Sequence, residues 1–221
     1  MEIKKMFINH NKTKAPNREI KYIVIHDTGN KNKGANVEAH FKFFNEANRG
    51  ASADFFVDDK IIGQFTDYKN EYAWHCGDGK GRNSITNANS VGIEICVNED
   101  GDYKKAFNNA VELTRYLMKE LNISINHVVR HFDASGKLCP ASMADNNWAK
   151  WKEFKELLVN KKKYGITTAS LLNVRIAPST RYGKIVKQYP KNTKVEILEE
   201  TDGWYKTKDG WINKGYVKVI K

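Results

Sequence analysis

Two histidines and one cysteine stand where this sequence could hold a metal ion. His26 ends the apolar run 21–26, His131 ends the run 128–131, and Cys139 follows eight residues later, just before a proline. Two imidazoles and one thiolate from separate elements leave one position of a tetrahedral zinc open for water, which is the layout of a catalytic zinc. Taken singly, a histidine at the end of a strand is also typical of a structural residue, and a lone cysteine of a small buried hydrophobe. The spacing alone leaves both interpretations open.

The segments around these residues alternate between strand and helix patterns. The run 21–26 is rich in β-branched residues, as expected of a strand buried on both faces that ends where open α/β sheets place ligand-binding groups. Apolar residues at steps of three and four predict an amphipathic helix over 103–121. The other expected strands lie in a hairpin over 54–65 and at 91–97 and 126–131, and the other expected helices are 36–48 and 145–159. Strands mixed with helices indicate an α/β domain over residues 1–160.

The pattern changes beyond residue 160. The lysine run 161–163 is expected to form a solvated linker. Residues 164–221 contain short strand-like runs broken by Pro178, Pro190 and two Asp-Gly pairs, and they show no helical period. Short strands with frequent turns over about 60 residues predict a small all-β barrel.

Charge is unevenly distributed between these two parts. Residues 161–221 hold 14 Lys/Arg and 5 Asp/Glu, a net charge of +9, whereas residues 1–160 hold 23 and 21, a net charge of +2. The C-terminal part is therefore expected to contact a polyanion. Nucleic acid, anionic lipid and a wall rich in teichoic acid all fit the charge alone.

Composition excludes several classes of protein. With 40% apolar and 11% aromatic residues, a chain of 221 residues can bury a core and is not expected to be disordered. No apolar run approaches the roughly 20 residues that a membrane span needs. Cys76, Cys96 and Cys139 are too few for a disulfide framework, so Cys76 and Cys96 are expected to be inert core thiols, with a disulfide between them as the alternative. The first residues, MEIKKMFINHNKTK, lack the apolar stretch of a standard secretory signal, so we expect synthesis in a cytoplasm and another route of release.

Five short motifs give a family resemblance. In chain order they are 23–28 (IVIHDT), 73–77 (AWHCG), 90–95 (SVGIEI), 130–133 (RHFD) and 137–140 (KLCP). Residues 22–140 thereby resemble the amidase-2 family, which has the fold of phage lysozyme and of peptidoglycan-recognition proteins and hydrolyses the N-acetylmuramoyl–L-alanine bond. The resemblance implies a mixed central sheet flanked by helices. It also implies one zinc ion per chain, bound by His26, His131 and Cys139.

The resemblance assigns roles to two charged residues. Glu94 lies in an apolar strand, where alternation puts its side chain on one face and Ile93 and Ile95 on the other. By analogy with the family, Glu94 is the general acid/base that accepts a proton from water and passes it to the leaving amine. Lys137 then stabilises the negative charge that develops on the carbonyl oxygen. The alternatives, in which neither residue is catalytic, are an outward-facing glutamate on an edge strand and a solvated surface lysine.

The sequence departs from the family pattern at two places. Asp27 stands where many members have a second histidine, and residues 53–54 read Ala-Asp where some have Tyr-His. The catalytic tyrosine of one branch is therefore missing, which places more weight on Glu94. Trp74 and His75 lie in one of the matching motifs and are expected to line the substrate cleft, although a structural histidine fits equally well.

The C-terminal residues resemble a second family. The run 172–180 (LNVRIAPST) and the aromatic motifs after it resemble bacterial SH3-type wall-binding domains over 164–221. Trp204, Tyr205 and Trp211 either offer flat surfaces for peptide or glycan, or they form the core of the barrel. The resemblance implies binding to peptidoglycan, and the net charge suits anionic wall polymers.

Together these observations predict a zinc-dependent amidase that cuts bacterial peptidoglycan while its C-terminal domain holds it on the wall. The architecture resembles a phage endolysin that leaves the cell through a lesion made by a partner protein, with a bacterial autolysin exported by another route as the alternative. A peptidoglycan-binding protein without catalysis, and a thiol hydrolase with Cys139 as nucleophile and His131 as base, are the competing functions. Nucleic-acid binding is disfavoured, because wall binding and catalysis together explain the charge better.

Overall fold

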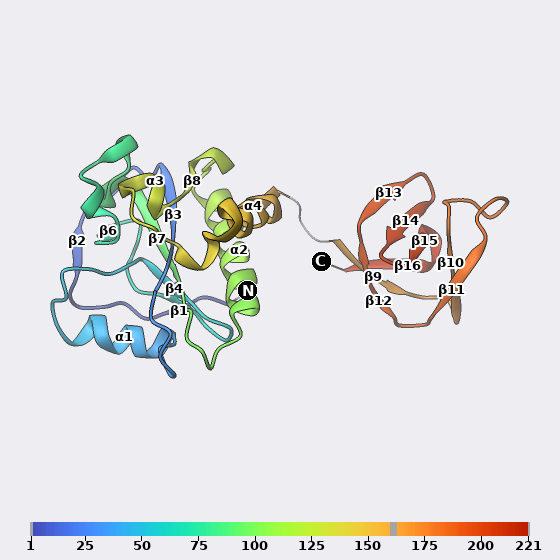
Figure 1. Cartoon of the computed structure of the whole chain (residues 1–221), viewed down its shortest axis with the longest axis horizontal. Helices are drawn as coiled ribbons and strands as arrows, with labels where there is room; N and C mark the ends of the chain where they lie inside the picture. The colour runs from blue at the N-terminus through green and yellow to red at the C-terminus, as the bar shows by residue number, and fades with distance from the viewer. Residues whose placement is uncertain (1, 160–162, 221) are drawn as a thin grey trace. The chain divides into compact units, whose positions relative to one another are not determined.

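The computed structural model describes residues 2–159 and 163–220, and these two ranges form two compact units (Figure 1). Of the expected linker, Lys161 and Lys162 lie outside the described residues, whereas Lys163 begins a strand of the second unit. Within the described ranges, no helix is both long enough and apolar enough to cross a bilayer.

A six-stranded mixed sheet forms the centre of the N-terminal unit. Its strands, in spatial order, are β1 (Lys4–Lys5), β5 (Ile62–Gln64), β4 (Phe55–Val57), β7 (Ser90–Ile95), β3 (Tyr22–Asp27) and β8 (Val128–Arg130). β3 pairs in parallel with β7 and β8, and β4 pairs antiparallel with β5 in the expected hairpin. A separate pair joins β2 (Lys12–Lys14) to β6 (Glu71–Ala73). The predicted α/β fold with a mixed sheet is confirmed.

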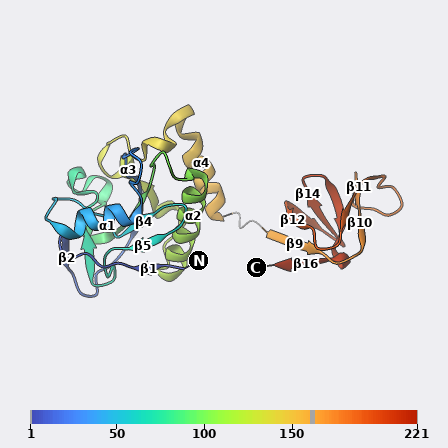
Figure 2. The ribbon, with the colours of Figure 1, turned by 90° about the horizontal axis from the view of Figure 1, so that it is seen from below.

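Helices cover both faces of this sheet. They are α1 (Val37–Glu46), α2 (Tyr103–Glu120), α3 (His131–Ser135) and α4 (Asp145–Val159), with the short 3-10 turns η1 (Gly77–Gly79), η2 (Arg82–Ser84), η3 (Asn87–Asn89), η4 (Ile125–His127) and η5 (Ala141–Met143). α2 and α4 lie together on one face and α1 lies on the other (Figures 1 and 2). The three expected helices agree with α1, α2 and α4 to within two residues at each end.

The expected strand over 126–131 is wrong at both ends. Only β8 is extended, because η4 precedes it and His131 begins α3 instead of ending the strand. The carboxylate of Asp133 accepts hydrogen bonds from the backbone N–H and the guanidinium of Arg130. These bonds close the first turn of α3 and end the strand at Arg130.

Side-chain alternation divides β3 and β7 between the two faces of the sheet. Ile25 and Ile93 are fully buried in the core that the sheet shares with α2 and α4. His26 and Glu94, one position further along each strand, point to the opposite face and are direct partners in the parallel register. The apolar core on one face thus fixes two polar side chains next to each other on the other face.

The C-terminal unit is all-β, as predicted. One antiparallel sheet has the order β11 (Ile185–Pro190), β10 (Leu171–Arg175), β15 (Gly210–Asn213), β14 (Trp204–Thr207) and β13 (Glu199–Thr201), and a second has the order β12 (Lys194–Ile197), β9 (Lys163–Thr167) and β16 (Val217–Ile220), preceded by the turn η6 (Lys214–Tyr216). Tyr205 packs in the core between the sheets and Trp204 is also buried. Of the three aromatics considered for ligand contact, only Trp211 is partly exposed.

Candidate functional site

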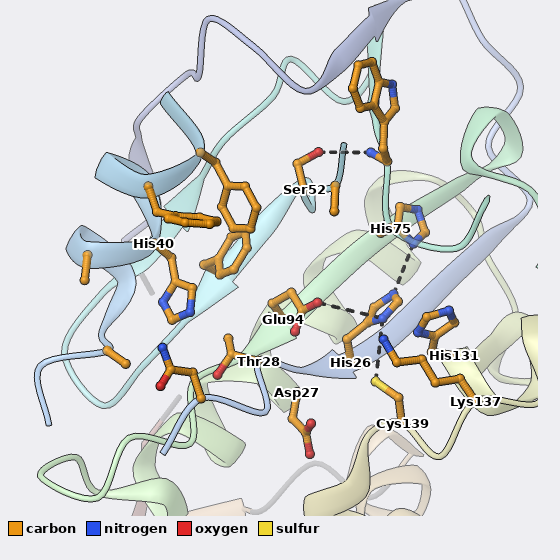
Figure 3. Close-up of a pocket in the computed structure, with 18 residues that line it drawn as sticks. His26, Asp27, Thr28, His40, Ser52, His75, Glu94, His131, Lys137 and Cys139 are labelled. Carbon is orange, nitrogen blue, oxygen red and sulfur yellow. Dashed lines mark hydrogen bonds and ion pairs between the residues drawn. The ribbon is translucent and has the colours of Figure 1, made fainter. Parts of the chain in front are cut away.

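His26, His131 and Cys139 converge at one end of a cleft (Figure 3). His26 lies near the end of β3, His131 is the first residue of α3, and Cys139 lies in the loop after α3. The backbone N–H of Phe132 donates a hydrogen bond of 2.9 Å to the carbonyl oxygen of Cys139 and so holds this loop against α3. One potential ligand atom from each of the three side chains lies within 4.8 Å of the other two. The sequence therefore identified three buried residues that the fold does bring together.

The hydrogen bonds of the two imidazoles leave one nitrogen of each for a metal. Nε2 of His131 is 2.8 Å from Oδ1 of Asp78, while its buried Nδ1 has no hydrogen-bond partner among the described residues. Nε2 of His26 is 3.1 Å from Nδ1 of His75, and Nδ1 of His26 is 3.8 Å from Sγ of Cys139. Histidines that bind metal are commonly oriented in this way, by a partner on the ring nitrogen that does not bind it. The residues present fit a zinc ion.

Burial sets the protonation states of these groups. The pKa of His26 lies well below its usual value because burial penalises the charged imidazole, and the nearby His75 adds to the effect. Burial also raises the pKa of the Cys139 thiol to about 12, with Glu94 adding to the rise. A neutral imidazole is the form that binds zinc, whereas the thiol has to lose its proton on binding.

Glu94 faces the same end of the cleft from β7. Its Oε1 lies 3.9 Å from Nδ1 of His26, and its buried Oε2 has no hydrogen-bond partner in the part of the chain that the structure describes. Burial raises the pKa of this carboxyl well above its usual value; Asp27 reinforces the rise and Lys137 opposes it. A carboxylate with a raised pKa accepts a proton more readily than a solvated glutamate does.

The cleft has a volume of about 490 Å³. Asp27 and the exposed Lys137 border the end where His26, His131 and Cys139 converge. Trp74 and His75 both line it, although His75 is only 8% exposed and lies against His26. Residues of α1 line the opposite end with apolar and aromatic side chains: Ala39, His40, Phe43 and Phe44. The cleft thus leads from a polar, acidic end to an aromatic one.

A match to known families accounts for this arrangement. Residues 16–142 match the family described as N-acetylmuramoyl-L-alanine amidase. The chain belongs to that amidase family. The match includes every residue that lines the cleft. A second match, to the bacterial SH3 domain, covers residues 170–218 in the all-β unit.

Two curated relatives from Bacillus subtilis (strain 168) are named N-acetylmuramoyl-L-alanine amidases. CwlH is 46% identical over 133 residues, which are 60% of this chain and 50% of CwlH. XlyA is 43% identical over 134 residues, which are 61% of this chain and 42% of XlyA. The chain spans about half the length of the curated relatives that it matches.

The amidase unit also resembles solved structures. The catalytic domain of XlyA is 38% identical with a TM-score of 0.63, and the alignment covers 72% of this chain and 99% of that domain. PlyL is 34% identical with a TM-score of 0.61, covering 72% of this chain and 97% of that structure. Both alignments cover almost all of a structure that is smaller than this chain, so the similarity concerns one unit of it.

The two departures from the amidase pattern have structural roles here. Oδ2 of Asp27 accepts a hydrogen bond of 2.6 Å from the backbone N–H of Ser142, which ties the loop that carries the cysteine to β3. Asp54 is fully buried and accepts hydrogen bonds from the backbone N–H groups of Ala73 and Gly92. Both aspartates thus join segments that position the site.

Two hydrogen-bond partners of histidines in the site were missed at the level of sequence. Asp78, which pairs with His131, directly follows the motif 73–77, and a carboxylate beside a matching motif is a signal that could have identified it. Ser90 is 3.1 Å from Nε2 of His75. No sequence pattern predicts this second contact, because it depends on how two separate segments pack.

Cys76 and Cys96 are buried outside the cleft. All three cysteines of the chain are free, so no disulfide joins these two. Burial raises the pKa of Cys76 to about 11 and also raises the pKa of Cys96. Both thiols therefore stay protonated and unreactive near neutral pH.

Proposed function

We propose that this chain is a zinc-dependent amidase that hydrolyses the bond between N-acetylmuramic acid and L-alanine in bacterial peptidoglycan. The observation that carries the proposal is the convergence of His26, His131 and Cys139 beside Glu94 in one cleft. Membership of the amidase family supports the choice of bond. The same cleft leaves room for a substrate on the open side of the three ligands.

The residues around the cleft have different roles in amide hydrolysis. His26, His131 and Cys139 would hold a zinc ion, which would supply Lewis-acid chemistry for polarising the scissile carbonyl and activating water near neutral pH. Glu94 accepts a proton from the attacking water and returns it to the leaving nitrogen. The ammonium of Lys137, at the rim of the cleft, stabilises the charge that develops on the carbonyl oxygen.

Two competing functions fit the site less well. A thiol hydrolase needs a thiolate, but burial raises the pKa of Cys139 to about 12 when no metal is bound. A protein that only binds peptidoglycan needs no carboxylate beside the three proposed ligands, whereas Glu94 places its Oε1 3.9 Å from Nδ1 of His26.

Digestion of purified bacterial walls tests the proposed reaction. We expect one zinc ion per chain by elemental analysis, release of new L-alanine amino termini, and no new reducing sugar ends, because an amide is cut and the glycan stays whole. A chelator should abolish the release. Reducing ends would identify a glycosidase, and lysis by a zinc-free preparation that resists chelator would exclude the zinc mechanism.

We further propose that the SH3 unit holds the enzyme on the wall. Residues 161–221 carry a net charge of +9, which suits anionic wall polymers, and tethering raises the effective concentration of enzyme at an insoluble substrate. A solved structure that is 39% identical, with a TM-score of 0.61 and a coverage of 72% of this chain and 99% of that one, is titled a mutant endolysin from Bacillus subtilis. We therefore propose an endolysin-like route, with synthesis in the cytoplasm and release onto the wall.

Truncation after Val159 separates anchoring from chemistry. The shortened chain should stay folded and zinc-loaded and should cleave soluble muropeptides at an unchanged rate, because the site lies wholly within residues 16–142. Its binding to intact walls should fall, and added salt should weaken wall binding by the full-length chain more than its soluble turnover. Sedimentation with walls measures binding. Equal sedimentation of the full-length and truncated chains would contradict the anchor role.

A further inference from the structure

His75 contacts Nε2 of His26, whereas the Sγ of Cys139, another proposed ligand, lies near Nδ1 of the same ring. The two rings are perpendicular, with centroids 5.2 Å apart, and Nδ1 of His75 lies 3.1 Å from Nε2 of His26. We propose that His75 is a positioning residue, which holds the proton of His26 on Nε2 and leaves Nδ1 of His26 free to bind metal, and that Ser90 fixes His75 in turn. This inference rests on the zinc site proposed above.

The hydrogen bonds of Ser90 determine which nitrogen of His75 carries a proton. Oγ of Ser90 is 2.5 Å from the carbonyl oxygen of Thr86, which can only accept, so the single hydroxyl proton of Ser90 is used there. Oγ of Ser90 is also 3.1 Å from Nε2 of His75. Since the serine oxygen must accept in this second bond, His75 carries its proton on Nε2.

The position of the proton on His75 determines in turn which nitrogen of His26 carries a proton. With its proton on Nε2, His75 presents a lone pair at Nδ1, and the only hydrogen that can satisfy it across the 3.1 Å contact is one on Nε2 of His26. A neutral His26 with its proton on Nε2 has a bare Nδ1, the atom that lies 3.8 Å from Sγ of Cys139. The chain Thr86–Ser90–His75 therefore selects the metal-binding tautomer of His26.

The surroundings of His75 are shaped to hold its ring in this place. A Cβ on Gly92 of β7 would lie 2.6 Å from Cγ and 2.9 Å from Nδ1 of His75, so only glycine leaves room for the ring against the strand. Oδ1 of Asn87 accepts hydrogen bonds from the backbone N–H groups of His75 and Cys76, at 3.0 and 2.8 Å. Backbone and side chain of His75 are thus fixed independently of any metal.

Two substitutions of similar size separate a hydrogen-bonding role from a packing role. Asparagine carries Oδ1 on Cγ, as histidine carries Nδ1, so His75→Asn keeps an acceptor for His26, whereas His75→Leu does not. Zinc affinity of the full-length chain is measured by competition with a chromogenic chelator. His75→Leu should weaken zinc binding about 10–100-fold, the usual effect of losing an outer partner of a metal ligand, and His75→Asn should fall between it and the wild type. The exposed His10→Leu is the control and should bind zinc like the wild type.

The outcomes of this measurement are distinct. Equal losses in His75→Asn and His75→Leu would show a packing role and overturn the inference, as would unchanged zinc affinity in His75→Leu. If the wild-type chain itself bound no zinc, the proposed function would fail instead, and the next experiment would still decide the role of His75.

Nuclear magnetic resonance of the zinc-free full-length chain determines directly which ring nitrogen of His26 carries the proton. Long-range proton–nitrogen correlation spectra should show the proton on Nε2 in the wild type. Ser90→Ala removes the acceptor that fixes His75, so the fraction of His26 with its proton on Nδ1 should rise. A proton on Nδ1 of His26 in the wild-type chain, or a tautomer that Ser90→Ala leaves unchanged, would overturn the inference.

Discussion

Replacing Glu94 with glutamine is expected to slow the release of L-alanine amino termini from purified walls by about 10²–10⁴, the usual contribution of general acid–base catalysis. Glutamine keeps the size of the side chain but cannot accept the proton of the attacking water. Zinc content and melting temperature should stay near their wild-type values, because Glu94 is not one of the three proposed ligands. Its Oε2 also has no hydrogen-bond partner to lose among the described residues. Rate, zinc content and melting temperature are measured on one preparation.

The exposed Glu99→Gln provides a matched control for this substitution. It removes the same charge from the loop that follows β7, away from the cleft, and should leave turnover unchanged. Near-wild-type turnover by Glu94→Gln with zinc in place would show that the base lies elsewhere. Asp27, the other carboxylate that borders the cleft, would then be the residue to replace.

The elements that carry the site were easier to predict than the contacts between them. A continuous apolar run identified the strand that ends near His26, and alternation placed Glu94 on one face of its own strand. Only the parallel pairing of β3 with β7 sets these two side chains next to each other. The pattern within each strand carries no information about this pairing, so the contact came from the family resemblance.

His131 shows how a local hydrogen bond can override an apolar pattern. The run 126–131 is typical of a strand, but the carboxylate of Asp133 accepts the backbone N–H of Arg130 and starts α3 at His131. The proposed ligand therefore lies at the start of a helix, which also lets its Nε2 reach Asp78. The family resemblance implied that His131 is a ligand, whereas only the folded chain shows how its ring is oriented.

The aromatics of the SH3 unit illustrate a second limit of sequence patterns. Trp204 and Tyr205 are neighbours in β14, so alternation would place one of them inside and the other outside. Both are nevertheless buried: Tyr205 packs in the core between the sheets, whereas Trp204 lies beside Leu171 and Tyr216. Trp211 remains partly exposed, with the ammonium of Lys206 5.5 Å from its ring centroid. Its availability for a wall ligand could not be predicted from residue type.

Replacing Cys139 with serine is expected to lower zinc affinity by more than about 100-fold, beyond the 10–100-fold that follows the loss of an outer partner, because a direct ligand is removed. Thiolate is the softest ligand of the three, and a serine hydroxyl is a poor substitute for it. Turnover should fall with zinc occupancy. Elemental analysis after gel filtration measures occupancy, and release of L-alanine amino termini measures turnover. Cys96→Ala removes another buried thiol without touching the cleft and should retain one zinc per chain.

The same variant separates a metal ligand from a thiol nucleophile. If Cys139 binds zinc, a large excess of zinc should restore part of the turnover of Cys139→Ser, because the two histidines and Glu94 remain in place. If Cys139 is a nucleophile, turnover is lost at every zinc concentration, since serine lacks the reactive sulfur. Wild-type zinc affinity in Cys139→Ser would exclude the cysteine as a ligand. Loss of turnover without loss of zinc would show that the thiol of Cys139, and not a metal ion, carries out the reaction, and would contradict the proposed mechanism.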